Sequence, residues 1–168
     1  KLNAERYAHP LRVMQVCDAE AIGARFWDEA MKRLPLGSRL MPHAREVLEY
    51  LRPRYRMYIL SNGFAELQSR KMQSAGIENF FDGVILSEDI GVNKPNPLIF
   101  HHALQVAGVD ASEVLMIGDN LEADIEGASR VGIDQVYYDI AGATCGNATS
   151  LHSSPTYTIS SLLELKGI

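Results

Sequence analysis

Short apolar runs alternate with helical patterns along most of this chain, and this alternation constrains the fold more than any other feature. The runs lie at 57–60, 84–86, 115–117, 135–138 and 157–159. The helical segments between them stop at Gly76, Gly108 and Gly132, and glycine is a favoured residue just past a helix end. Strands that alternate with helices indicate a parallel sheet covered on both faces. The sequence therefore predicts a three-layer α/β domain.

The first 36 residues follow a different, helical pattern. A stripe of apolar residues recurs there at steps of four: Ile22, Phe26, Ala30 and Leu34. This spacing predicts an amphipathic helix, which the proline and glycine at positions 35 and 37 would end. We therefore divide the chain into a helical part, 1–36, and an α/β domain, 37–168.

Composition excludes several classes of protein. The 168 residues are 46% apolar and 22% charged, which is typical of a globular domain. A net charge of −5 argues against nucleic acid or a membrane surface as partner, and no apolar run could span a bilayer. The two cysteines, Cys17 and Cys145, lack the spacing of a disulfide framework or metal cluster, so we expect reduced thiols in a cytoplasmic protein. The sequence does not indicate the oligomeric state.

Ligands of parallel α/β sheets bind beyond the carboxyl ends of the strands, and this rule selects the residues to consider. Ser61 and Asn62 follow the first apolar run, Lys94 lies in the loop after the second, and Asp119 follows the third. Asp124 comes five residues later. Each residue also has a plain structural interpretation.

Asp119 and Asp124 form a carboxylate pair suited to a hard cation such as Mg²⁺, with Gly118 giving backbone clearance. The alternative is that Asp119 caps the next helix and Asp124 is a solvated acid in its first turn. Lys94 is either a solvated lysine or an ammonium held by a stiff loop against a phosphate. Ser61 is either a helix N-cap or a hydroxyl beside unpaired amides that attract an anion. Together they provide the charge neutralisation that phosphoryl transfer requires.

Three segments resemble motifs II, III and IV of the haloacid dehalogenase (HAD) superfamily. They read ILSNG at 59–63, GVNKPNPLIF at 91–100 and MIGDNLEADIEGA at 116–128. Within the superfamily, LMP at 40–42, SNGF at 61–64 and LSED at 86–89 look most like pyrimidine 5′-nucleotidases of the YjjG type. The resemblance implies a Rossmann-like core, Mg²⁺ as cofactor and a small phosphorylated metabolite, such as a nucleoside monophosphate, as substrate.

The same resemblance implies a role for each candidate residue. Ser61, helped by the amide of Asn62, would bind the transferring phosphoryl group, and Lys94 would neutralise charge. Asp119 would ligate Mg²⁺, while Asp124 would support the metal's waters or orient Lys94. Residues 1–36 would be the remnant of a helical cap that closes over the site.

The superfamily's nucleophile, the first aspartate of Asp-x-Asp-x-Thr, is not in this sequence. Asp18 follows an apolar stretch but lacks the threonine and leads into the helical stripe, so we interpret it as a helix N-cap. In the superfamily the missing strand lies in the centre of the sheet. The chain also begins at Lys1, so we expect it to be a fragment of a longer enzyme, inactive and poorly folded alone.

Two other functions stay open at this stage. A 2-haloacid dehalogenase shares the fold, but its chemistry needs no cation, and the Asp119 and Asp124 pair argues against it. A non-catalytic relative that binds phosphate ligands or partners would explain the missing nucleophile. Retention of Lys94 and both acids favours an enzyme instead.

Overall fold

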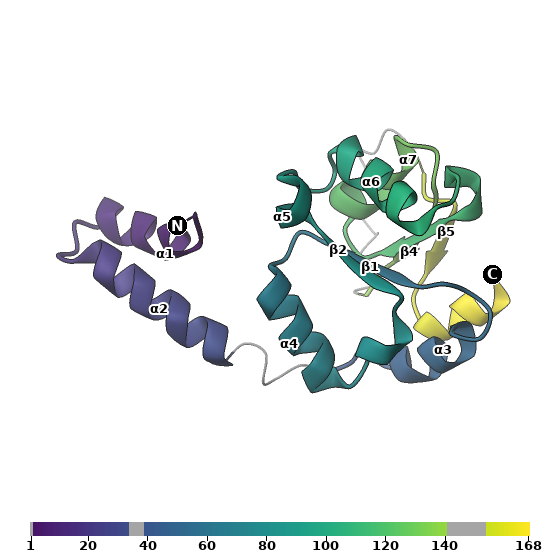
Figure 1. The fold of residues 1–168 in the computed structure, drawn as a ribbon, viewed down its shortest axis with the longest axis horizontal. Coiled ribbons are helices and arrows are strands. Elements are labelled where there is room, and N and C mark those ends of the chain that lie inside the picture. Colours follow the sequence, from purple (N-terminus) through teal and green to yellow (C-terminus); the bar gives the residue numbers. More distant parts are fainter. Residues whose placement is uncertain (1, 34–38, 141–153) are drawn as a thin grey trace. The chain divides into compact units, whose positions relative to one another are not determined.

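The computed structural model describes residues 2–33, 39–140 and 154–168 (Figure 1). Two compact units make up the chain. The first comprises Lys1–Arg39 with Glu66–Gly76, and the second Leu40–Ala65 with Ile77–Ile168. The first unit thus includes a helix, α4 (Ala65–Ala75), from within the predicted α/β domain.

The first unit contains a helical hairpin of α1 (Leu2–Val13) and α2 (Ala19–Arg33). The helices approach closely at Gly23, where an added Cβ would lie 2.7 Å from the backbone nitrogen of Ala8. The ring of Tyr7 packs against Phe26 nearby, at a centroid distance of 5.1 Å. The predicted apolar stripe is not the covered face, since Ile22 and Phe26 are 38% and 60% exposed. Small residues determine the contact between α1 and α2. Leu34, the last residue of the predicted stripe, lies outside the described residues.

Asp18 lies in the turn between these helices and not at a strand end. Its carbonyl accepts the N–H of Ile22 at 3.0 Å, so it immediately precedes α2 as an N-cap residue does. Its φ of 59° is left-handed, unlike the extended backbone usual at that position. Asp18 is therefore not a displaced strand-end nucleophile in this structure.

The second unit has the α/β architecture that the sequence predicts. In chain order its helices and strands are α3 (Ala44–Leu51), β1 (Tyr58–Ser61), η2 (Glu78–Phe80), β2 (Gly83–Leu86), α5 (Ser87–Ile90), α6 (Pro97–Ala107), η3 (Ala111–Glu113), β3 (Leu115–Gly118), η4 (Leu121–Glu126), α7 (Gly127–Ser129), β4 (Asp134–Tyr138), β5 (Tyr157–Ile159) and η5 (Leu162–Gly167). The glycines predicted to end helices, Gly76, Gly108 and Gly132, all have positive φ. Their left-handed backbone turns the chain toward the next strand at little steric cost.

The described strands form two parallel sheets instead of one. β1 pairs with β2, with Tyr58 opposite Gly83, and β4 lies between β3 and β5. Every pairing is parallel, which confirms the α/β prediction. Among the described residues no strand pairs with the free edges of β1 and β3.

Two hydrophobic cores lie on opposite faces of the strands (Figure 1). On the side of α6 and α7, Phe100 and Ile99 are fully buried, and Leu60 of β1 and Met116 of β3 both pack against them. This shared core joins the two sheets into one layer. On the side of α3 and η5, Val136 and its neighbours form the second core. Leu115 and Ile117 of β3 remain 39% exposed.

Two helix predictions need correction. The segment after Asp119 begins as a π-helix, η4, and α7 is only a short continuation. The N–H of Ile125 reaches the carbonyl of Asn120, five residues back, because the backbone widens where Asp124 is buried. The final helix predicted at 162–165 is the 3₁₀ helix η5, whose capping box involves Ser161 and Glu164.

Among the described helices, none has the length and apolar character needed to cross a membrane. Cys17 is a free, exposed thiol, and Cys145 lies outside the described residues.

Candidate active site

Lys94 and Asp124 form a buried ion pair at the centre of the candidate site. The Lys94 ammonium lies 2.6 Å from Asp124 Oδ1, and the two side chains are 10% and 8% exposed. Lys94 Nζ also donates to the carbonyl of Leu60, on β1, at 2.8 Å. The interpretation of Lys94 as a solvated surface lysine is therefore wrong. An ammonium has three donors, and these two bonds use two of them.

Asp124 is fixed by contacts on both carboxylate oxygens. Oδ1 accepts from Lys94, and Oδ2 accepts the N–H of Asn120 at 3.1 Å. Its side chain folds back against Gly118, where a Cβ would come within 2.4 Å of Asp124 Cβ. This contact confirms that Gly118 provides clearance. Asp124 is thus no solvated acid, and its geometry suits orienting Lys94 more than direct coordination of a metal.

Asn62 holds the main chain of Lys94 with both polar atoms of its side chain. Asn62 Oδ1 accepts the Lys94 N–H at 2.8 Å, and Nδ2 donates to the Lys94 carbonyl at 3.1 Å. The two residues are 32 positions apart in sequence. Ser61, Asn62, Lys94 and Asp124 are therefore brought to one place, as the strand-end rule predicts.

Ser61 is the last residue of β1 and is half-buried. Its Oγ accepts the N–H of Gly63 at 3.0 Å, so the hydroxyl closes a turn and does not cap α4. The first N–H of α4, on Ala65, instead donates to the carboxylate of Glu88 at 3.1 Å. Sequence reasoning missed Glu88, which follows β2 by two residues and which no local pattern connects to α4.

Asp119 is exposed directly beyond β3, and Asn120, rather than Asp119, caps the following helix by accepting the N–H of Ala123. The pKa of the Tyr137 phenol is raised mainly by burial, and further by the carboxylates of Asp139 and Asp119. Sequence reasoning missed Tyr137, although its register opposite Gly118 places it beside the site.

The donors fit a magnesium ion that keeps most of its ligands as water and substrate oxygens. Asp119 offers an exposed carboxylate at the strand end, and Asp124 lies nearby in the same loop and helix. Within the described ranges, no three His, Cys, Asp or Glu side chains converge as a complete cage. An exposed carboxylate such as that of Asp119 suits Mg²⁺ that it shares with a phosphate.

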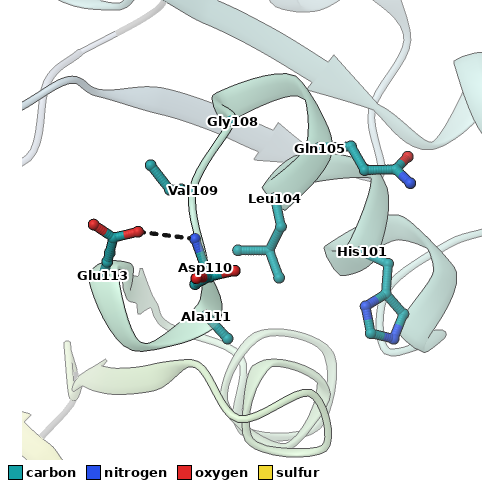
Figure 2. A pocket seen from close by; sticks show the side chains of 8 residues that line it. All are labelled: His101, Leu104, Gln105, Gly108, Val109, Asp110, Ala111 and Glu113. Atoms are coloured by element: carbon teal, nitrogen blue, oxygen red, sulfur yellow. Dashed lines mark hydrogen bonds between the residues drawn. The ribbon is translucent and has the colours of Figure 1, made fainter.

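A surface hollow of about 600 Å³ lies elsewhere in the second unit (Figure 2). Its walls include His101 and Gln105 of α6, together with Asp110 and Glu113. The carboxylate of Glu113 accepts the N–H of Asp110 at 3.0 Å. None of the predicted site residues lines this hollow.

Comparison with known proteins gives consistent matches to one family. The family model of haloacid dehalogenase-like hydrolases matches residues 6–132. Pyrimidine 5′-nucleotidase YjjG of Escherichia coli (strain K12) is 39% identical over 132 residues, covering 75% of this chain and 55% of that protein. Glyceraldehyde 3-phosphate phosphatase of Pyrococcus abyssi is 45% identical over 101 residues, covering 60% and 42%. The chain thus spans about half the length of the curated relatives it matches.

Solved structures agree on the fold. The HAD hydrolase YfnB from Bacillus subtilis, bound to magnesium, is 25% identical with a TM-score of 0.80, covering 98% of this chain and 69% of that one. A 2-haloacid dehalogenase from Pseudomonas syringae pv. Tomato DC3000 is 24% identical with a TM-score of 0.77, covering 99% and 69%. At that identity the second likeness shows the fold alone.

Proposed function

Since this chain belongs to the haloacid dehalogenase-like hydrolase family, we propose that it forms the phosphate- and magnesium-binding part of a phosphomonoester hydrolase. The buried ammonium of Lys94, paired with Asp124 at 2.6 Å beside the end of β1, is the observation that carries this function. Burying an ammonium is costly unless it is paired and used. An ammonium held at a strand end is well suited to bind a phosphate oxygen.

Each residue of the site then has a chemical role. The Ser61 hydroxyl and the backbone amide of Asn62 bind the phosphoryl oxygens, and Lys94 neutralises their charge. Asp119 holds Mg²⁺, and Asp124 keeps Lys94 in place and supports the metal's water shell. Magnesium, when bound, adds positive charge at the phosphate oxygens. Positioning and charge neutralisation are the main needs of phosphoryl transfer.

Turnover needs a nucleophile that these residues do not supply. In the roles proposed above Ser61 binds phosphoryl oxygens, Asp119 holds Mg²⁺ and Asp124 holds Lys94 at 2.6 Å, so none of them is the nucleophile. The aspartate of an Asp-x-Asp-x-Thr segment would supply it, on a strand between β1 and β3. The 168-residue chain by itself then hydrolyses no phosphate esters.

The substrate is a small phosphorylated metabolite, with nucleoside monophosphates as the first candidates because YjjG is a pyrimidine 5′-nucleotidase. Residues 1–36 act as the remnant of a cap that helps to select it. The scattered cysteines support a cytoplasmic location. A 2-haloacid dehalogenase has weaker support, because the structural likeness to one is at the level of fold and the curated relatives above are a nucleotidase and a phosphatase.

The test is a screen of phosphate esters and 2-haloacids with the full product of the gene, with Mg²⁺ and with EDTA. We expect phosphate release from nucleoside monophosphates that EDTA abolishes and Mg²⁺ restores. Lys94→Met should remove this activity, whereas Lys71→Met, on α4, should retain it. Halide release that is insensitive to EDTA, without phosphate release, would identify a dehalogenase instead.

A further inference from the structure

We infer that Asn62 is a positioning residue: its side chain fixes the main chain of Lys94 and thereby the place of the ammonium relative to Ser61. This role rests on the proposed function, because it concerns how the same site holds a phosphate. In this role the Asn62 side chain acts through Lys94 and does not contact the substrate.

The hydrogen bonds of Asn62 form a closed pair with one residue. Its Oδ1 accepts from the Lys94 N–H at 2.8 Å, while its Nδ2 donates to the Lys94 carbonyl at 3.1 Å. A carboxamide presents one acceptor and one donor group in a plane, so it can pair with a residue's N–H and C=O as a neighbouring strand would. Two such bonds fix orientation as well as distance. The oxygen and at least one amide hydrogen of Asn62 are thereby directed at protein and not at a ligand.

Lys94 is also held at its other end. Its ammonium donates to the Leu60 carbonyl at 2.8 Å and to Asp124 at 2.6 Å. Leu60 and Asn62 are the two sequence neighbours of Ser61, so β1 binds Lys94 on both sides of the serine. Lys94 is therefore held beside Ser61 through both of its sequence neighbours, although Lys94 lies in a loop and Ser61 ends β1.

Without Asn62 the ammonium would keep its ion pair, but its backbone would lose its link to the end of β1. Lys94 belongs to no helix or strand, so no strand pairing fixes its main chain. Misplacing a catalytic group by about 1 Å can reduce the rate on the order of 100-fold. Asn62 is exposed, and exposed hydrogen bonds contribute little to folding because water replaces them. Its loss should therefore affect phosphate handling more than stability.

The test compares Asn62→Ala and Asn62→Asp with Asn96→Ala in the full product of the gene. Asn96 lies in the same loop but caps α6, accepting the N–H of Leu98 at 3.0 Å. The measurements are the affinity for inorganic phosphate with Mg²⁺, kcat and KM for p-nitrophenyl phosphate, the thermal midpoint, and the amide ¹H and ¹⁵N shifts of Lys94 without ligand.

We expect Asn62→Ala to weaken phosphate affinity and to lower kcat by about tenfold or more, with its thermal midpoint close to that of the unaltered protein. Its Lys94 amide shift should move, whereas Asn62→Asp, which keeps the acceptor, should leave that shift near its original place. Asn96→Ala should lower the thermal midpoint and leave phosphate affinity unchanged.

If Asn62→Ala has a phosphate affinity and a kcat within twofold of those of the unaltered protein, the positioning role is overturned and the proposed function stands. Weakened affinity with an unmoved Lys94 amide shift would also overturn the positioning role, because Asn62 would then act on phosphate directly. If the unaltered protein binds no phosphate and hydrolyses no ester, the proposed function fails, and the positioning role with it.

Discussion

Replacing Asp124 by asparagine leaves the ammonium of Lys94 buried without its carboxylate. The two side chains are 10% and 8% exposed, so water cannot readily replace the lost partner. Removing one member of a buried ion pair costs about 3–5 kcal/mol, compared with about 0.2–1 kcal/mol for an exposed pair. The asparagine keeps an oxygen for the Asn120 N–H, so the loss reports mainly on the charge. Against a typical stability of about 5–15 kcal/mol, this effect is large.

The matched control is the Arg70–Glu66 pair, which has the same N–O distance of 2.6 Å but side chains 47% and 70% exposed. We expect Glu66→Gln to cost less than about 1 kcal/mol in urea unfolding of the full product of the gene. Lys94→Met should be destabilising alone, and the double variant with Asp124→Asn should recover much of the loss. Equal costs for Asp124→Asn and Glu66→Gln would refute the reasoning, because burial would then have no effect.

Three further predictions concern packing, acid stability and the metal. Gly118→Ala should lower the thermal midpoint and the phosphatase rate together, because its Cβ would come within 2.4 Å of Asp124 Cβ; an unchanged rate would contradict this. The pKa of Glu164 is lowered, chiefly by the N–H of Ser161, so its unfolded form takes up a proton at higher pH than its folded form. The contribution of Glu164 to folding stability is therefore present above the ordinary pKa of 4.5 and is lost as the pH falls below it. The stability difference between the unaltered protein and Glu164→Gln should shrink on acidification. A difference independent of pH would argue against this. Asp119→Asn should raise the Mg²⁺ concentration needed for half-maximal activity, as a magnesium titration measures, and an unaltered titration would exclude Asp119 as a ligand.

Local patterns predicted the strands of this chain well. β5 has the predicted limits, 157–159, and β4 begins one residue earlier than predicted. The glycines at 76, 108 and 132 marked the helix ends because only their backbone turns at little cost into the left-handed region. The described strands form two parallel sheets. Strand limits and helix ends depend on residues close together in the chain, so they can be predicted from the sequence.

Contacts between distant segments could not be predicted from the sequence. The two bonds from Asn62 to Lys94 and the one from Lys94 to the Leu60 carbonyl each span more than 30 residues and involve main-chain atoms that any residue would offer. Likewise, the sequence pattern predicts an ordinary helix after Asp119, whereas in the structure this segment begins as a π-helix. In α2, Gly23 lies against the backbone of α1, while Phe26 packs on Tyr7 and stays 60% exposed. Sequence therefore identified the residue types of the site but not how they hold one another.

The central claim is that these 168 residues carry a phosphate-binding site without the nucleophile that would use it. The most direct measurement compares the 168-residue chain with the full product of the gene, both by ³¹P NMR binding of inorganic phosphate and by Mg²⁺-dependent release of phosphate from nucleoside monophosphates. We expect the full product to bind phosphate and to turn the esters over in a manner that depends on Lys94, and the 168-residue chain to release no phosphate from them. Robust magnesium-dependent turnover by the chain alone would contradict the claim.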